Sequence, residues 1–323
     1  PTDNLNPYDF EDILDFGRHR GSDALNLQYY LGNKFSIQAV FIPIFQPANL
    51  PLGIFAGSLS PSMEIPPGMV LEDYSDTILM PKYNLDESVT AGLRFKGFAG
   101  GLDFSLSYVW GRDGLPYNTS NTIIPIDLQG GVSVDARLTY ERNHIIGADL
   151  ATSIAGIGFW AEAAMYFPPQ DVIMLNDLTA FYPASPDPVI VDSTILEAKP
   201  YMKFVMGGDY FFGDGSYLNV QYIHGFIHER GKEALNDYLF LRYDKSFLND
   251  KLKISPLSGA MIVTDWNDIQ HNYAFAYMPE IIYAATVNTE ISLAVVLLQG
   301  EGENLFSNMK DFDMFTFKLT YMF

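Results

Sequence analysis

Residues 314–323 read MFTFKLTYMF, and every second side chain is large and apolar: Phe315, Phe317, Leu319, Tyr321 and Phe323. Successive side chains of a β-strand point to opposite faces, so this segment forms a strand with one apolar face. A strand of this kind that ends the chain on an aromatic residue is typical of an outer-membrane β-barrel, in which one face contacts lipid and the other lines the lumen.

Composition agrees with a membrane barrel. The chain has 323 residues, of which 48% are hydrophobic and 15% aromatic, with 24 Phe and 20 Tyr. Phe and Tyr favour strands and membrane interfaces. The longest apolar runs, such as 39–45 and 293–298, are much shorter than the roughly 18 to 20 residues of a transmembrane helix. A chain of this kind crosses a bilayer only as a closed barrel, because hydrocarbon cannot satisfy open sheet edges.

Charge and cysteine content exclude several functions. The formal net charge is -20, from 39 acidic and 19 basic residues, which argues against a nucleic-acid partner. The absence of cysteine removes disulfides, iron–sulfur clusters and covalent haem attachment, and we expect no cofactor. The chain begins without Met and without a signal peptide, so we expect it to be processed or truncated.

Alternation recurs along the chain and predicts 13 to 14 strands. We expect strands at residues 24–31, 35–45, 88–98, 102–110, 137–154, 157–167, 201–212, 217–226, 237–247, 252–263, 272–284, 289–299 and 314–323. Long connections fall at residues 46–87, 111–136, 168–199, 227–236, 264–271 and 300–313. They alternate with short turns such as Gly32-Asn33-Lys34, an asymmetry typical of outer-membrane barrels. We therefore expect a single barrel domain over 1–323, with 1–23 as a loop leading into the first strand.

An odd strand number departs from the even number usual in bacterial barrels. If the last strand descends to the periplasm, the first one descends as well, and at least one earlier strand is needed. The Pro, Asn and Asp residues of segment 1–9 favour turns. Either a strand escapes the pattern, or an amino-terminal part of the barrel is missing.

Three segments carry a resemblance to a known family: PTDNLNPYD (1–9), GSDALNLQYY (21–30) and AVFIPIFQPA (39–48). They resemble large, mostly uncharacterised outer-membrane barrels similar to alginate-export-type porins. GADLA (147–151), leading to WAEAA (160–164), fits the same pattern. In such proteins several strands precede this type of Asn-Pro loop, which implies a complete barrel of about 16 to 18 strands. The low content of Arg and Lys departs from what export of an acidic polysaccharide requires.

The positions between the outward apolar residues are expected to face the lumen. Their charged members are of mixed sign, and charges facing one another across a pore set its selectivity. The alternative is that they form salt bridges between strands or with an inserted loop. The predicted pore-lining residues are Arg94, Lys96, Asp103, Asp149, Glu162, Lys203, Asp209, Arg242, Asp244, Lys253, Glu280, Glu290 and Lys318.

The connection 46–87 is unusually long and contains apolar stretches at 50–55 and 69–71. Two placements would bury these stretches. The connection could fold inward and narrow the pore, or it could pack against other extracellular loops or a partner.

Candidates for catalysis and metal binding are weak. His224, His228 and Glu229 form the densest group, but it lies where a strand runs into a loop, so helical metal-ligand spacing loses its meaning. Acidic clusters in the connections, such as Asp265-Trp266-Asn267-Asp268, lack the spacing of a calcium loop. We therefore expect neither a metal site nor an enzyme.

Together these features predict a porin-like channel in the bacterial outer membrane that passes small solutes. Its surroundings would be membrane lipid and lipopolysaccharide, and it could be a monomer or an oligomer. The alternative is a barrel scaffold or sheath that docks a partner, such as a secreted protein, a lipoprotein or a cytochrome.

Overall fold

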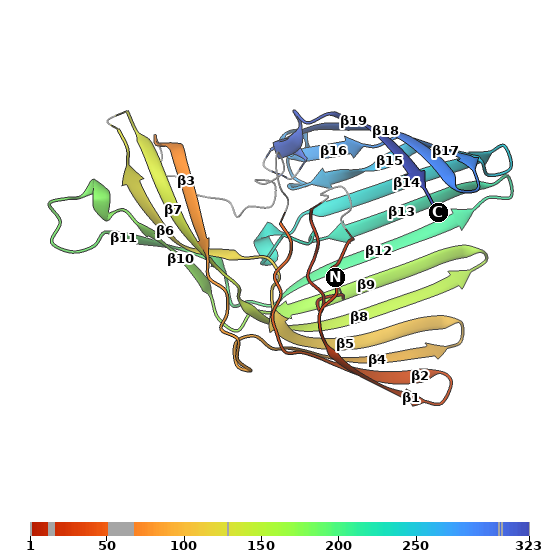
Figure 1. Ribbon diagram of the computed structural model, residues 1–323, viewed down its shortest axis with the longest axis horizontal. Coiled ribbons are helices and arrows are strands. Elements are labelled where there is room, and N and C mark those ends of the chain that lie inside the picture. Colours follow the sequence, from red (N-terminus) through yellow and green to blue (C-terminus); the bar gives the residue numbers. More distant parts are fainter. Residues whose placement is uncertain are drawn as a thin grey trace.

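The computed structural model describes residues 2–11, 17–50, 68–127, 129–302, 304 and 306–322. It is an all-β protein (Figure 1). Short 3-10 helices cover Thr179–Phe181, Lys232–Ala234, Ile269–His271 and Ser307–Met309. No helix in the described ranges has the length and apolar character that a membrane span requires.

A large antiparallel sheet of 14 strands forms the main body. Its strands are β1 (Leu25–Leu31), β2 (Phe35–Ile42), β4 (Thr90–Ala99), β5 (Leu102–Arg112), β8 (Arg142–Ile154), β9 (Ile157–Phe167), β12 (Tyr201–Phe211), β13 (Ser216–His224), β14 (Asp237–Phe247), β15 (Leu252–Val263), β16 (Tyr273–Tyr277), β17 (Glu280–Thr286), β18 (Thr289–Glu301) and β19 (Met314–Tyr321). Each strand pairs with its neighbours along the chain in this sheet, and short turns join the strands at one end. The antiparallel sheet is therefore confirmed, as are the positions of eleven of the thirteen expected strands, the exceptions being 137–154 and 272–284. Phe323 lies outside the described residues.

One expected strand, 272–284, is interrupted. β16 and β17 both pair with β15 on one side and β18 on the other, so together they occupy a single strand position. The break falls at Met278 and Pro279, close to Pro256 of β15. Proline has no N–H to donate to the ladder, so two prolines at one level disrupt pairing. The Met278 N–H still donates to Ser258 O at 2.7 Å.

Three of the expected long connections contain strands that were not expected. Connections 46–87, 111–136 and 168–199 contribute strands to a second sheet of five strands, which projects away from the main sheet at the upper left of Figure 1. Its order is β11 (Ile190–Leu196), β10 (Val172–Asp177), β6 (Tyr117–Pro125), β7 (Gly131–Thr139), β3 (Val70–Ile78). Alternating apolar side chains explain this sheet: Val132, Val134 and Ala136 of β7 are all fully buried.

The expected strand 137–154 is also wrong as a single element. It divides at Tyr140 and Glu141 into β7, which belongs to the second sheet, and β8, which belongs to the main sheet. Both halves alternate in hydrophobicity. Period-2 alternation marks a strand but does not say which sheet it joins.

The main sheet is curved, with β1 and β19 at its two edges (Figure 1). In the described part of the chain, β1 pairs with β2 and β19 pairs with β18. Every step between these edges is antiparallel, and their number is even, so β1 and β19 run in the same direction.

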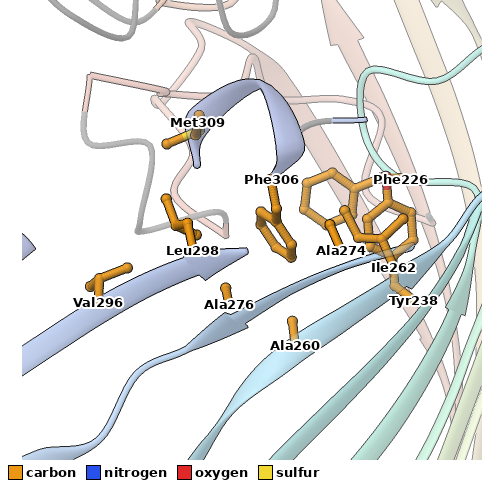
Figure 2. Close-up of a cluster of buried hydrophobic side chains, with 10 residues drawn as sticks. All are labelled: Phe226, Tyr238, Ala260, Ile262, Ala274, Ala276, Val296, Leu298, Phe306 and Met309. Atoms are coloured by element: carbon orange, nitrogen blue, oxygen red, sulfur yellow. The ribbon is translucent and has the colours of Figure 1, made fainter. Parts of the chain in front are cut away.

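Connections fold onto one face of the main sheet at the end opposite the short turns. Figure 2 shows one such place, where Phe306 and Met309 of connection 302–313 lie over side chains from the strands. The buried cluster comprises Phe226, Tyr238, Ala260, Ile262, Ala274, Ala276, Val296, Leu298, Phe306 and Met309. The strand residues of this cluster share one face, which is the face described below as the inner face.

Candidate functional site

The strand register separates the main sheet into an apolar outer face and a mixed inner face. Large side chains on the outer face are exposed: Leu106 is 56% exposed and Phe317 63%. Further members from strands across the sheet are Leu25, Leu27, Leu93, Ile146, Leu150, Met202, Met206, Leu239, Leu241, Phe315 and Leu319. The Asp, Glu, Lys and Arg residues that the described strands place on the outer face all lie at strand ends. They are Arg112, Arg142, Asp237, Lys245 and Glu301.

The register places all thirteen predicted pore-lining residues on the inner face. Adjacent strands bring Arg94 opposite Ser107, Asp149 opposite Glu162, and Arg242 opposite Asn219. The pairing register also places the remaining predicted residues on this face: Lys96, Asp103, Lys203, Asp209, Asp244, Lys253, Glu280, Glu290 and Lys318. Six of the thirteen are basic and seven acidic. They do not form one site, but separate into local groups.

One charge group joins β4, β5 and β8. Arg94 donates from Nε to Ser105 Oγ at 2.9 Å and from Nη2 to Asp149 Oδ2 at 3.1 Å. Ser105 Oγ also donates to Asp149. A cation held by a hydroxyl and a carboxylate on neighbouring strands ties these strands together, as the salt-bridge alternative anticipated.

A second group joins β14, β15 and β17. Arg242 Nε donates to Asp244 Oδ1 at 2.9 Å, and its Nη2 reaches Glu280 Oε2 at 3.4 Å. The hydroxyl of Ser255, which is fully buried, donates to Asp244 Oδ1 at 2.6 Å. Lys253 Nζ lies 3.9 Å from Asp244 Oδ2. This network ties the three strands together on the inner face.

The remaining predicted residues are dispersed. Asp209 accepts a hydrogen bond from Tyr217 Oη at 3.1 Å. The described part of the chain gives Lys96, Asp103, Glu290 and Lys318 no ion pair that joins them to either group.

Sequence reasoning missed the role of residues 2–10, here called the amino-terminal segment. It lies against the inner face, where Thr2 Oγ1 donates to Glu162 Oε2 at 3.0 Å and Tyr166 Oη donates to Asn4 Oδ1 at 3.0 Å. Leu5 lies directly over Gly92, at which a Cβ atom would come within 2.9 Å of Leu5 Cδ2. Apolar residues at positions 5, 8 and 10 of an otherwise polar loop were the available signal.

A cavity of about 540 Å³ lies between the amino-terminal segment and the inner face. Apolar and aromatic side chains make up about half of its lining, which also contains five amide and five charged side chains. Its lining residues include Phe45, Asn143, Tyr166, Lys203, Phe226 and Phe240. A second cavity of about 260 Å³ lies beside Thr2, Arg94, Ser107 and Asp149.

A partly buried ion pair fixes the connections at the end of the first cavity. Arg230 Nε donates to Asp113 Oδ2 at 2.7 Å, and its guanidinium lies 4.0 Å from the centroid of the Tyr117 ring. Burial alone would raise the pKa of Asp113, but the charge and hydrogen bond of Arg230 lower it below its usual value. Lys203 Nζ donates to the carbonyls of Phe226 at 2.7 Å and Ile227 at 3.1 Å. Connections 113–116 and 225–236 are thus held onto the sheet.

The long connection 46–87 reaches two places. Asn49 N donates to Tyr8 O at 2.8 Å, which attaches its beginning to the amino-terminal segment. Met69 packs against the buried Ile123 and Val134 of the second sheet. The apolar stretch 50–55 lies outside the described residues after Leu50, and the expected constriction by this connection stays a prediction.

The histidines form no shared site. His224 Nδ1 lies 2.8 Å from Asp237 Oδ1 on the outer face, whereas His228 packs edge-on against the Phe226 ring. Among the residues that the structure describes, no group of three His, Asp or Glu side chains has the arrangement of a metal site.

No protein-family model matches the chain, and no curated protein matches it.

Proposed function

We propose that the protein is a porin-like channel that passes small solutes across the outer membrane. The observation that carries this proposal is the contrast between the two faces of the main sheet. A face whose large apolar side chains are exposed along the whole sheet, with charges only at strand ends of the described part, suits a lipid environment. The charged inner face would line the passage.

The arrangement of connections supports the same function. Short turns lie at one end of the sheet, and the long connections at the other end carry the second sheet. Outer-membrane barrels have this asymmetry, with long connections outside the cell.

Planar lipid bilayers provide the test. Purified protein with the heat-modifiable gel mobility of a folded barrel is expected to produce discrete conductance steps in potassium chloride. If protein that is folded by this criterion produces no conductance steps in repeated bilayer experiments, a channel function is refuted.

A barrel that docks a partner is the second candidate, and the second sheet favours it. All nine residues of its edge strand β3 are exposed, and an exposed edge presents unpaired backbone groups to another chain. A stoichiometric partner that copurifies in mild detergent, and is lost when residues 68–78 are replaced by a Gly/Ser linker, would favour docking over a free pore.

A further inference from the structure

We propose that the cavity between the amino-terminal segment and the inner face binds a small, uncharged aromatic molecule that carries a hydroxyl group. This inference rests on the proposed channel function, since it names the class of solute that the channel selects.

The shape and chemistry of the cavity fit such a ligand. A volume of about 540 Å³ is within the range of small-molecule sites, which are typically apolar with a few placed polar groups. Side chains from distant strands and connections converge on it, among them Phe45, Phe226 and Phe240. These rings offer apolar surface to a flat ligand.

A buried polar atom in the wall needs a hydrogen-bond donor. Asn143 is only 2% exposed, and its side-chain oxygen has no hydrogen-bond partner. Such atoms in native proteins are rare and call for a partner. Asn143 lines the cavity, so a ligand hydroxyl could donate to this oxygen. His19 Nε2, also in the lining, has no hydrogen-bond partner and lies 3.9 Å from Asp3 Oδ2.

The charged groups of the lining are already engaged by the protein itself. Asp113 is paired with Arg230, Lys203 and Arg112 each donate to two backbone carbonyls, and Glu162 accepts from Thr2. The remaining carboxylate of the lining, Asp3, is 56% exposed and accepts a hydrogen bond from Leu5 N at 3.4 Å. A charged ligand would lose its hydration without gaining a dedicated counter-ion. The cavity therefore favours a neutral ligand over an anion or a cation.

The test compares three probes of similar shape: 2-naphthol, naphthalene and 2-naphthoate. Full-chain protein in lipid nanodiscs is titrated with each probe by fluorescence, and empty nanodiscs of the same lipid provide the correction for partitioning. We expect saturable binding of 2-naphthol that is at least tenfold tighter than binding of either other probe. Equal affinity for all three, tighter binding of 2-naphthoate, or absence of saturable 2-naphthol binding would overturn the proposal.

Variants locate the site. Asn143→Leu removes the acceptor and should abolish the preference for 2-naphthol over naphthalene, a ratio that a general loss of stability does not change. If that variant fails to fold, Val205→Trp, which fills the cavity from β12, should weaken both probes at least tenfold. Asn26→Leu, on the inner face of β1, is the matched control and should leave both affinities unchanged, because neither Asn26 nor its hydrogen-bond partner Gln38 lines the cavity. Unaltered binding in Val205→Trp would contradict the site.

Conductance separates this proposal from the channel function. If the protein conducts ions but does not bind 2-naphthol, the proposed ligand site is refuted and the channel function is not. If it binds 2-naphthol but never produces conductance steps, the channel function is refuted and the ligand site is not.

Discussion

Single residues determine how closely the amino-terminal segment approaches the sheet. Gly92 leaves room for Leu5, and a Cβ at Gly147 would come within 3.2 Å of Thr2 Cγ2. Glycine permits such close approach because it has no side chain. These contacts could not be predicted, since a glycine within a strand pattern indicates a close neighbour without saying which segment supplies it.

His228 makes stability depend on pH. Burial is the main cause that lowers its pKa to about 4, and the charges of Lys203 and Arg230 lower it further against the opposing effect of Glu229. The unfolded chain binds a proton near the usual histidine pKa of about 6.5, whereas the folded protein does so only near 4. The contribution of neutral His228 to the free energy of unfolding is therefore fully present above about pH 6.5. It is lost as the pH falls towards 4, by up to about 3 kcal/mol.

His228→Gln should reduce this acid loss, measured as the difference in free energy of urea unfolding between pH 7 and pH 4 in lipid vesicles. His271→Gln is the matched control. His271 is exposed, and its hydrogen bond with Asp268 raises its pKa, so any stabilisation it provides is present at acid pH and lost as pH rises. An acid loss that is the same in His228→Gln and the natural chain would contradict the assignment.

Among the elements, the strands of the main sheet could be predicted and the second sheet could not. Outward residues such as Leu93, Leu106 and Phe317 alternate strictly with polar ones, because one face is apolar and the other carries charge. In β7, Val132 and Val134 alternate equally well, but one of the two partner strands of β7 is β3, from a connection about 60 residues earlier. Alternation contains no information about such distant pairing.

Only part of the candidate site could be predicted from the sequence. The charged residues of the inner face follow from parity along each strand, so Arg94 and Lys203 could be assigned to that face. The cavity depends on the amino-terminal segment and on connections that fold back onto the sheet. No sequence motif distinguishes Asn143 from the other polar residues of the strands. Its role depends on the burial of its side-chain oxygen without a hydrogen-bond partner, which is a property of the folded chain.

Adjacent residues of β5 provide a test of the two faces. Leu106→Arg places a charge in the middle of the outer face and should destabilise the protein in lipid by about 2 to 4 kcal/mol, as expected near the bilayer midplane. Ser107→Arg, on the inner face beside the cavity of about 260 Å³, should be tolerated. The measurement is the folded fraction in vesicles against urea concentration. Equal effects of the two substitutions would contradict a lipid-facing outer surface.

For the whole molecule, the near balance of six basic and seven acidic residues on the inner face predicts weak ion selectivity. Replacing Arg94 and Lys96 together by Gln should shift the reversal potential in a potassium chloride gradient towards cation selectivity, since Asp149 loses its partner. The control is the double variant Lys34→Gln and Lys82→Gln, which removes the same total charge from a turn and a connection and should leave the reversal potential nearly unchanged. A reversal potential that moves equally in both double variants would exclude a specific role of the inner face.

The second sheet also constrains the order of folding. Its strands arrive from three connections, each following a different strand of the main sheet, and Asn121 reaches Asn176 across 55 residues at 2.8 Å. The β6–β7 and β10–β11 pairs close short loops, as the hairpins of the main sheet do. The β3–β7 and β6–β10 pairings, which assemble the second sheet, join segments about 55 to 60 residues apart and cost more chain entropy. The second sheet is therefore completed late, after the main sheet has brought the three connections together, and any lesion that delays this step leaves the exposed strand β3 unpaired in the meantime.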